Sequence, residues 1–235
     1  MLKLSNINVD LAGNRILRDV TASFDSARTI GIVGRNGAGK TTLLRAIMGL
    51  AKLRSGQIFF DQTELSRLPG HMRAALNVGY APENRVIFPT MTVRENLALP
   101  CEVQGQSKSA IAARMETVLR VVPQLEPMLG RSGSALSGGQ GKMVALGRAV
   151  MIGTRLLMLD EPFQGLAPKL AREYTEALGR LKELQPEVCI VITESNIKLL
   201  ADIPDQIWTI ERGSIAQEDM STAKTIVPSC GESSV

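Results

Sequence analysis

A glycine-rich segment between two different hydrophobic patterns constrains the fold of this chain more than any other stretch. Residues 34–42 read GRNGAGKTT and match the pattern G-x-x-x-x-G-K-[ST]. Residues 29–33 form a short apolar run typical of a buried parallel strand, and apolar residues recur at helical spacing over 43–48. A strand, this loop and a helix in sequence predict a phosphate-binding loop within an α/β fold.

The loop is expected to surround a polyphosphate. Its glycines let backbone N–H groups turn inward, and the following helix directs its positive end at the same anion. Lys40 is expected to reach the β- and γ-phosphates, and the Thr41 hydroxyl to ligate Mg²⁺. A plain turn joining strand to helix is the alternative, which the complete motif and its flanks disfavour. The predicted nucleoside triphosphate site comprises Gly34, Arg35, Asn36, Gly37, Ala38, Gly39, Lys40, Thr41 and Thr42.

Length and composition limit the classes of protein to which the chain can belong. The chain has 235 residues, 44% hydrophobic and 21% charged, which suits one sizeable α/β domain. No apolar run approaches the roughly 20 residues that span a bilayer. The three scattered cysteines resemble reduced cytosolic thiols. The net charge of +4 comes without a basic run, and aromatic residues are 3%, so nucleic acid is not an expected partner.

Hydrophobic periodicity predicts how the elements are ordered. Residues 1–28 alternate apolar and polar side chains, which indicates antiparallel strands before the loop. Residues 84–152 favour helix, including a helix capped by Ser107 and ended by Pro123 and Pro127. A second amphipathic helix is predicted over residues 170–184, and residues beyond about 220 resemble a frayed tail. Further strands are predicted at 57–62, 78–81, 156–159, 188–192 and 206–211.

An acidic pair follows one of these apolar strands. Asp160 and Glu161 stand at its carboxyl end, where ligands of open α/β sheets collect. Asp160 there can hold Mg²⁺, directly or through water, while the neighbouring Glu161 can polarise an attacking water. An acidic pair that only closes a strand and caps a helix is the alternative. The phosphate loop elsewhere in the chain favours the metal and base roles.

A second specific segment, residues 136–140, reads LSGGQ. Ser137 and Gln140 have the spacing of a capping box, and the apolar residues after them indicate a helix. Backbone donors at a Ser-Gly-Gly helix start suit a phosphate, although the same pattern also describes an ordinary helix start. The candidate phosphate-binding residues here are Ser137, Gly138, Gly139 and Gln140.

Together the three segments resemble the Walker A, signature and Walker B motifs of ABC-type ATPases, in that order and spacing. The resemblance implies one ABC ATPase domain over residues 1–220. Its P-loop NTPase core would have a mixed, mostly parallel sheet, an N-terminal antiparallel β part and a helical subdomain inserted at about 84–152. Residues 221–235 would be a flexible tail. The resemblance also implies a head-to-tail dimer that closes on ATP and Mg²⁺, with Lys40 and Glu161 catalytic and Asp160 linked to the metal.

Further segments of the sequence indicate one subfamily of the ABC-type ATPases. Residues 80–89 and 91–97 resemble the Q-loop region of importer ATPases for branched-chain amino acids, urea or amides. By that resemblance Glu83 would sense Mg²⁺ and a transmembrane coupling helix, although a solvated loop carboxylate is the alternative. The implied partners are transmembrane permeases, a second ATPase subunit and, indirectly, an extracytoplasmic solute-binding protein. The chain would then act in the cytoplasm, peripherally on the inner face of the cell membrane.

Three departures from the family pattern bear on activity. The switch position, often His or Gln, is Ser195, which has a shorter reach and cannot ionise. The position expected to carry the aromatic that stacks on adenine is Leu11, which has no π-face. Gly141 and Lys142 stand where the subfamily usually has polar amides. Hydrolysis is still expected, with Ser195 sensing the γ-phosphate and Leu11 covering the base.

Two other functions stay open on the sequence alone. One is a non-transport ABC ATPase of DNA repair or translation, although this chain has neither a second cassette nor a long coiled coil. The other is a regulatory subunit with weak hydrolysis, which Ser195 and Leu11 motivate.

Overall fold

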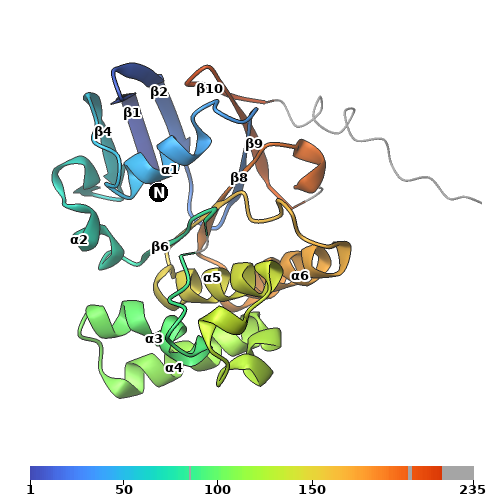
Figure 1. Cartoon of the computed structure of the whole chain (residues 1–235). Helices are drawn as coiled ribbons and strands as arrows, with labels where there is room; N and C mark the ends of the chain where they lie inside the picture. Colours follow the sequence, from blue (N-terminus) through green and yellow to red (C-terminus); the bar gives the residue numbers. More distant parts are fainter. Residues whose placement is uncertain (85, 201–202, 219–235) are drawn as a thin grey trace, which may run out of the picture.

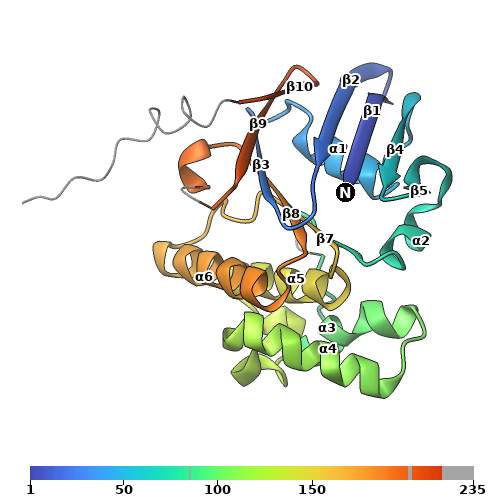
Figure 2. The same ribbon diagram turned by 180° about the vertical axis from the view of Figure 1, so that it is seen from behind.

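Two β-sheets and a group of helices make up the fold. The computed structural model describes residues 1–84, 86–200 and 203–218. Figures 1 and 2 show an antiparallel sheet and a larger, mostly parallel sheet. Most of the helices lie on the side of the larger sheet that is away from the antiparallel sheet. The prediction of a P-loop core with an antiparallel N-terminal part is confirmed. The predicted tail, residues 221–235, lies outside the described residues.

The larger sheet has six strands in the order β10-β9-β3-β8-β7-β6. All neighbours are parallel except the edge strand β10, which pairs antiparallel with β9. The central strands read as continuous apolar runs because both of their faces are covered. Its strands are β3 (Thr29–Val33), β6 (Val78–Ala81), β7 (Leu156–Asp160), β8 (Cys189–Glu194), β9 (Gln206–Glu211) and β10 (Ser214–Gln217).

The smaller sheet is antiparallel and has the order β2-β1-β4-β5. Leu2 of β1 lies opposite Phe24 on one side and Phe60 on the other, and all three are buried. Along β1 and β2, buried and exposed residues largely alternate, as the apolar–polar alternation of residues 1–28 predicts. Its strands are β1 (Leu2–Leu11), β2 (Asn14–Phe24), β4 (Ser55–Phe60) and β5 (Thr63–Glu64).

Strand β7, which lies between β8 and β6, separates two hydrophobic cores. Leu157 and Leu159 face the core shared with the large helices, whereas Leu156 and Met158 face the core shared with α1 and the antiparallel sheet. Because successive side chains of a strand point to opposite faces, one five-residue strand anchors both layers. Its carboxyl end, Asp160, is thereby fixed between them.

The helices divide between the two sides of the parallel sheet. The helix after the glycine-rich loop is α1 (Lys40–Ile47), and the short α2 (Gly70–Ala74) supports it. Arg73 of α2 is buried and its guanidinium donates to the carbonyl oxygens of Ala46 (2.8 Å) and Ile47 (2.7 Å). The cation thus satisfies carbonyls at the negative end of α1.

The remaining helices form the opposite layer. Helix α5 contacts strand β6 as well as helices α3 and α4, so it joins the sheet to the outer helices (Figure 1). Ser107 caps α4 as predicted, and α4 ends before Pro123, which opens a 3₁₀ turn. These helices are α3 (Val93–Val103), α4 (Lys108–Val121), α5 (Gly138–Ile152) and α6 (Pro168–Leu184).

Candidate functional site

The glycine-rich loop turns between β3 and α1. Gly39, which precedes α1, has φ +115°, a conformation that side chains disfavour. At Gly34 an added methyl group would overlap the backbone carbonyl of Ile210 on the neighbouring strand β9. Both glycines are therefore required by the backbone path of the loop, independently of any ligand.

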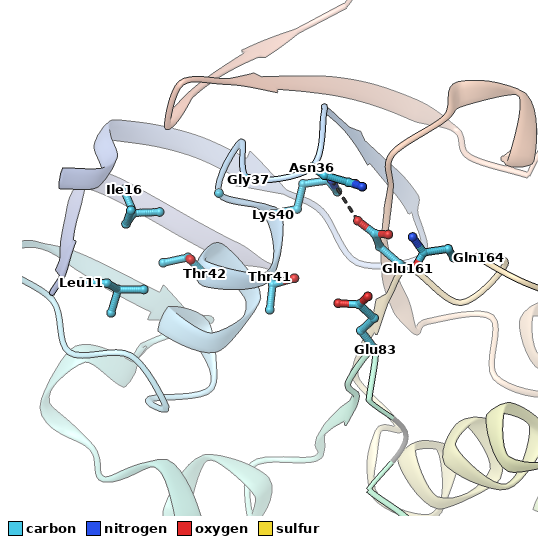
Figure 3. Close-up of a pocket in the computed structure, with 11 residues that line it drawn as sticks. Leu11, Ile16, Asn36, Gly37, Lys40, Thr41, Thr42, Glu83, Glu161 and Gln164 are labelled. Atoms are coloured by element: carbon cyan, nitrogen blue, oxygen red, sulfur yellow. Dashed lines mark ion pairs between the residues drawn. The ribbon is translucent and has the colours of Figure 1, made fainter. Parts of the chain in front are cut away.

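Lys40 projects back into the loop. Its ammonium donates to the carbonyl oxygens of Gly34 (2.7 Å) and Arg35 (3.2 Å). It also forms an ion pair with Glu161, with Nζ 3.0 Å from Oε1. Figure 3 draws this ion pair as a dashed line, and both residues are buried. The predicted base and the predicted phosphate-binding lysine therefore meet across the loop.

A cleft of about 420 Å³ opens over the loop. Leu11 and Ile16 line one end, and Glu83, Glu161 and Gln164 line the other (Figure 3). The cleft therefore has an apolar end suited to a nucleobase. At its charged end, Lys40 and the backbone N–H groups of the loop are the groups that can attract phosphates, and the carboxylates are not. Its other lining residues are Asn36, Gly37, Gly39, Lys40, Thr41 and Thr42.

Asp160 is 2% exposed and is not among the described residues that line this cleft, but it contacts Thr41, which does line it. Its Oδ1 accepts hydrogen bonds from Thr41 Oγ1 (3.1 Å) and Thr193 Oγ1 (2.8 Å), and its Oδ2 accepts one from the Tyr80 hydroxyl (3.2 Å). Burial raises the pKa of Asp160, and these three hydrogen bonds act against that shift. The carboxylate is thus fixed in orientation beside Thr41.

Tyr80 and Thr193 were not predicted as site residues. Both lie near the carboxyl ends of strands that flank β7, and the sheet register pairs Thr193 directly with Asp160. The strand order, which the sequence did not reveal, is what brings them to the carboxylate. Their place at strand ends was the one signal available.

The oxygen donors at this end fit Mg²⁺. Thr41, Asp160 and Glu83 offer a hydroxyl and two carboxylates, the hard ligands that this ion prefers. Within the described residues, no group of three or more His, Cys, Asp or Glu side chains forms a metal cage of its own. Mg²⁺ usually takes one or two protein carboxylates together with phosphate oxygens and water, and Asp160 and Glu83 could supply those carboxylates.

Glu161 adopts an unusual backbone conformation, with φ +46°. Its N–H donates to the carbonyl oxygen of Thr193 (3.1 Å) and lies 3.2 Å from that residue's hydroxyl. Its own carbonyl oxygen accepts from Lys142 Nζ (2.7 Å). A left-handed non-glycine residue of this kind persists where its surroundings fix it, and such residues concentrate at functional sites.

A buried carboxyl, Glu194, stands behind the turn that follows Glu161. Its Oε1 accepts a hydrogen bond from the N–H of Phe163 (2.8 Å). Burial raises the pKa of Glu194 to about 7, and the charge of Glu161 acts in the same direction. This group lies one residue before Ser195, and sequence reasoning did not single it out.

The signature segment forms the start of α5 as predicted. Ser137 accepts from the N–H of Gln140 (3.3 Å), and the Gln140 side chain accepts from the N–H of Ser137 (3.0 Å), which completes the capping box. Ser137 and Gly138 are exposed. None of the four predicted residues, Gly139 included, lines the cleft of the same chain as the described residues define it.

Two predicted residues occupy the edges of the site differently. Leu11, at 43% exposure, lines the apolar end of the cleft, where Ile16, which the sequence did not single out, joins it. Ser195 is half-buried and is not among the described residues that line the cleft. Its role at the γ-phosphate therefore stays a prediction.

Residues 17–164 match the sequence profile of the family described as ABC transporter. The probable branched-chain amino acid transport ATP-binding protein LivF of Archaeoglobus fulgidus is 32% identical over 216 residues, covering 92% of this chain and 90% of that protein. The high-affinity branched-chain amino acid transport ATP-binding protein BraG of Pseudomonas aeruginosa is 30% identical, covering 95% and 94%.

Other relatives carry different names. The sulfate/thiosulfate import ATP-binding protein CysA of Escherichia coli is 32% identical over 93% of this chain and 60% of its own length. A solved ATP-binding cassette of an ABC transporter in its ADP conformation superposes with TM-score 0.80 at 24% identity, covering 96% of this chain and 94% of that one. A dimeric cassette bound to ADP and Pi gives TM-score 0.81 at 23% identity, covering 94% and 99%.

The chain belongs to the ABC transporter family. Within that family it is an ATP-binding subunit and an ATPase. No helix in the part of the chain that the structure describes is long and apolar enough to cross a membrane.

Proposed function

We propose that this ATPase hydrolyses ATP in a head-to-tail dimer, with Glu161 as general base and Lys40 as the phosphate-binding cation. The observation that carries the proposal is the convergence of both side chains in one cleft, 3.0 Å apart. In the dimer, Ser137, Gly138, Gly139 and Gln140 of the second subunit face the γ-phosphate. The exposure of Ser137 and Gly138, and the position of all four residues outside the lining of their own chain's cleft as the described residues define it, support this arrangement.

The tasks of binding and hydrolysis then divide among the predicted site residues. Lys40 exchanges its ion pair with Glu161 for the β- and γ-phosphate oxygens, which leaves the Glu161 carboxylate to accept a proton from the attacking water. Thr41, Asp160 and Glu83 hold Mg²⁺, which when bound neutralises charge on the phosphates. Leu11 and Ile16 hold the nucleobase of ATP by apolar contact. Ser195 senses the γ-phosphate.

The transported solute is proposed from the relatives and from the Q-loop resemblance. LivF and BraG both carry branched-chain amino acid transport in their names, and this chain covers at least nine-tenths of each. We therefore propose an importer of branched-chain amino acids, urea or short amides. The ATPase lies on the inner face of the cell membrane, bound to separate permeases. A solute-binding protein delivers the solute to those permeases.

Affinity purification of the tagged chain from detergent-solubilised membranes tests this assignment. Two permeases and a second ATPase subunit should co-purify, and recovery of ribosomes or DNA in their place would overturn the transporter proposal. In proteoliposomes made with those permeases, binding protein loaded with leucine should stimulate ATP hydrolysis. Stimulation by sulfate alone would instead assign the solute class of the CysA relatives.

A second candidate is a regulatory subunit with weak hydrolysis. It is favoured by Leu11, whose aliphatic side chain is 43% exposed at the base end, and by the position of Ser195 outside the lining of the cleft. Turnover of the purified chain, first alone and then with its partner ATPase, separates the two candidates. A rate that depends entirely on the partner's own catalytic glutamate supports the regulatory role.

A further inference from the structure

Lys142 connects the signature helix α5 to the turn that carries the proposed base. Its ammonium donates to the carbonyl oxygens of Glu161 (2.7 Å) and Gln164 (2.7 Å). Both acceptors belong to the turn after β7, so one side chain of α5 holds residues 161–164 together. Lys142 also lines a small cavity of about 10 Å³ together with Glu83 and Asp160.

The backbone of Glu161 needs such a restraint. At φ +46° it lies in the left-handed region, which non-glycine residues adopt at a cost and keep only where neighbours fix them. β8 holds its N–H through the carbonyl of Thr193, and α5 holds its carbonyl through the ammonium of Lys142, whereas the ammonium of Lys40 in α1 pairs with the side-chain carboxylate. Of these contacts, the one from Lys142 acts directly on the Glu161 carbonyl.

We propose that Lys142 is a positioning residue for ATP hydrolysis, which holds the Glu161 backbone in its left-handed conformation and so sets the direction of the carboxylate. This inference rests on the proposed role of Glu161 as general base. Lys142 stands in the second turn of α5, whose first residue follows the exposed Ser137. A displacement of the signature helix therefore moves the turn that holds the base of the same subunit.

Lys142→Met isolates the proposed contact. Methionine keeps an unbranched apolar stem of similar reach and removes every donor, so packing is retained while both carbonyls lose their partner. Lys142→Arg is the conservative variant, since a guanidinium offers several donors to the same two oxygens. Lys3→Met, on the exposed face of β1, is the matched control for loss of one surface charge.

The full-length chain is assayed with Mg²⁺-ATP for kcat and KM. Lys142→Met should lower kcat by about 10- to 100-fold, the loss expected when a reacting group shifts by up to ~1 Å, and leave KM within about twofold. Lys142→Arg should restore most of that kcat, and Lys3→Met should match the wild type. Amide hydrogen exchange across residues 161–166 should become faster in Lys142→Met and stay unchanged in Lys3→Met.

Three results would overturn the proposal. They are an unchanged kcat in Lys142→Met, an equal loss of kcat, ATP affinity and thermal stability that arginine does not rescue, and unchanged exchange across 161–166. The exchange measurement decides the matter even if the isolated chain turns over slowly. Glu161→Gln, measured in parallel, tests the base separately, because normal turnover by that variant refutes the base assignment whatever Lys142 does.

Discussion

Replacing Glu194 by glutamine should remove a pH dependence of folding stability. The carboxyl is buried, its Oε1 accepts from the N–H of Phe163, and its pKa is raised from 4.5 to about 7. A raised pKa means that the folded state binds the proton more tightly than the unfolded state does. The contribution of Glu194 to stability is therefore complete below pH 4.5 and is lost as pH rises to about 7.

The size of the effect follows from the same shift. The difference between 4.5 and about 7, at about 1.4 kcal/mol per unit, gives an upper limit of roughly 3–4 kcal/mol. Glutamine resembles the protonated acid in shape, and its carbonyl oxygen can still accept from Phe163. Glu194→Gln should thus equal the wild type near pH 4.5 and exceed its stability at pH 8 by roughly 1–3 kcal/mol.

Urea denaturation at pH 5 and pH 8, followed by the fluorescence of the single tryptophan, Trp208, measures this difference. Glu116→Gln, on the exposed face of α4, is the control and should track the wild type at both pH values. A Glu194→Gln variant that is less stable than the wild type at pH 8 would refute the reasoning. It would mean that the ionised carboxylate is stabilised by its surroundings.

Two further variants test the support of α1 and the apolar end of the cleft. Arg73→Met should destabilise the fold by about 2–4 kcal/mol, because carbonyl groups at the end of α1 lose a charged donor, and thermal or urea denaturation against exposed Arg67→Met measures it. Leu11→Tyr should tighten ATP binding by about 2- to 10-fold, since an aromatic ring can stack on the base. Fluorescence titration with a labelled nucleotide measures that change. Unchanged affinity would mean that the nucleobase of ATP does not contact Leu11.

Local pattern predicted most of the fold. The apolar runs at β7, β8 and β9 and the caps at Ser107 and Ser137 were predicted because strand period and capping depend on neighbouring residues. The phosphate loop and the acidic pair were predicted for the same reason, and the structure brings Lys40 and Glu161 together.

The contacts that depend on strand order could not be predicted in this way. Thr193 and Tyr80 reach Asp160 only because β8 and β6 flank β7, and Ile16 reaches the cleft from the antiparallel sheet. Lys142 was noted as an unusual residue after the signature, yet its contact with the Glu161 carbonyl needs the packing of α5 on the sheet. Ser195 illustrates the opposite case. The motif identifies its position in the sequence, but it does not show whether the side chain reaches the cleft.

Steady-state phosphate release by Glu161→Gln tests the central claim most directly. The carboxylate lies 3.0 Å from Lys40 at the charged end of the cleft, and glutamine keeps its shape while removing its basicity. The variant should still bind ATP, and turnover should fall by about 100- to 10,000-fold, the usual contribution of a positioned general base. Turnover at the wild-type rate, with ATP binding intact, would contradict the assignment of Glu161 as the base.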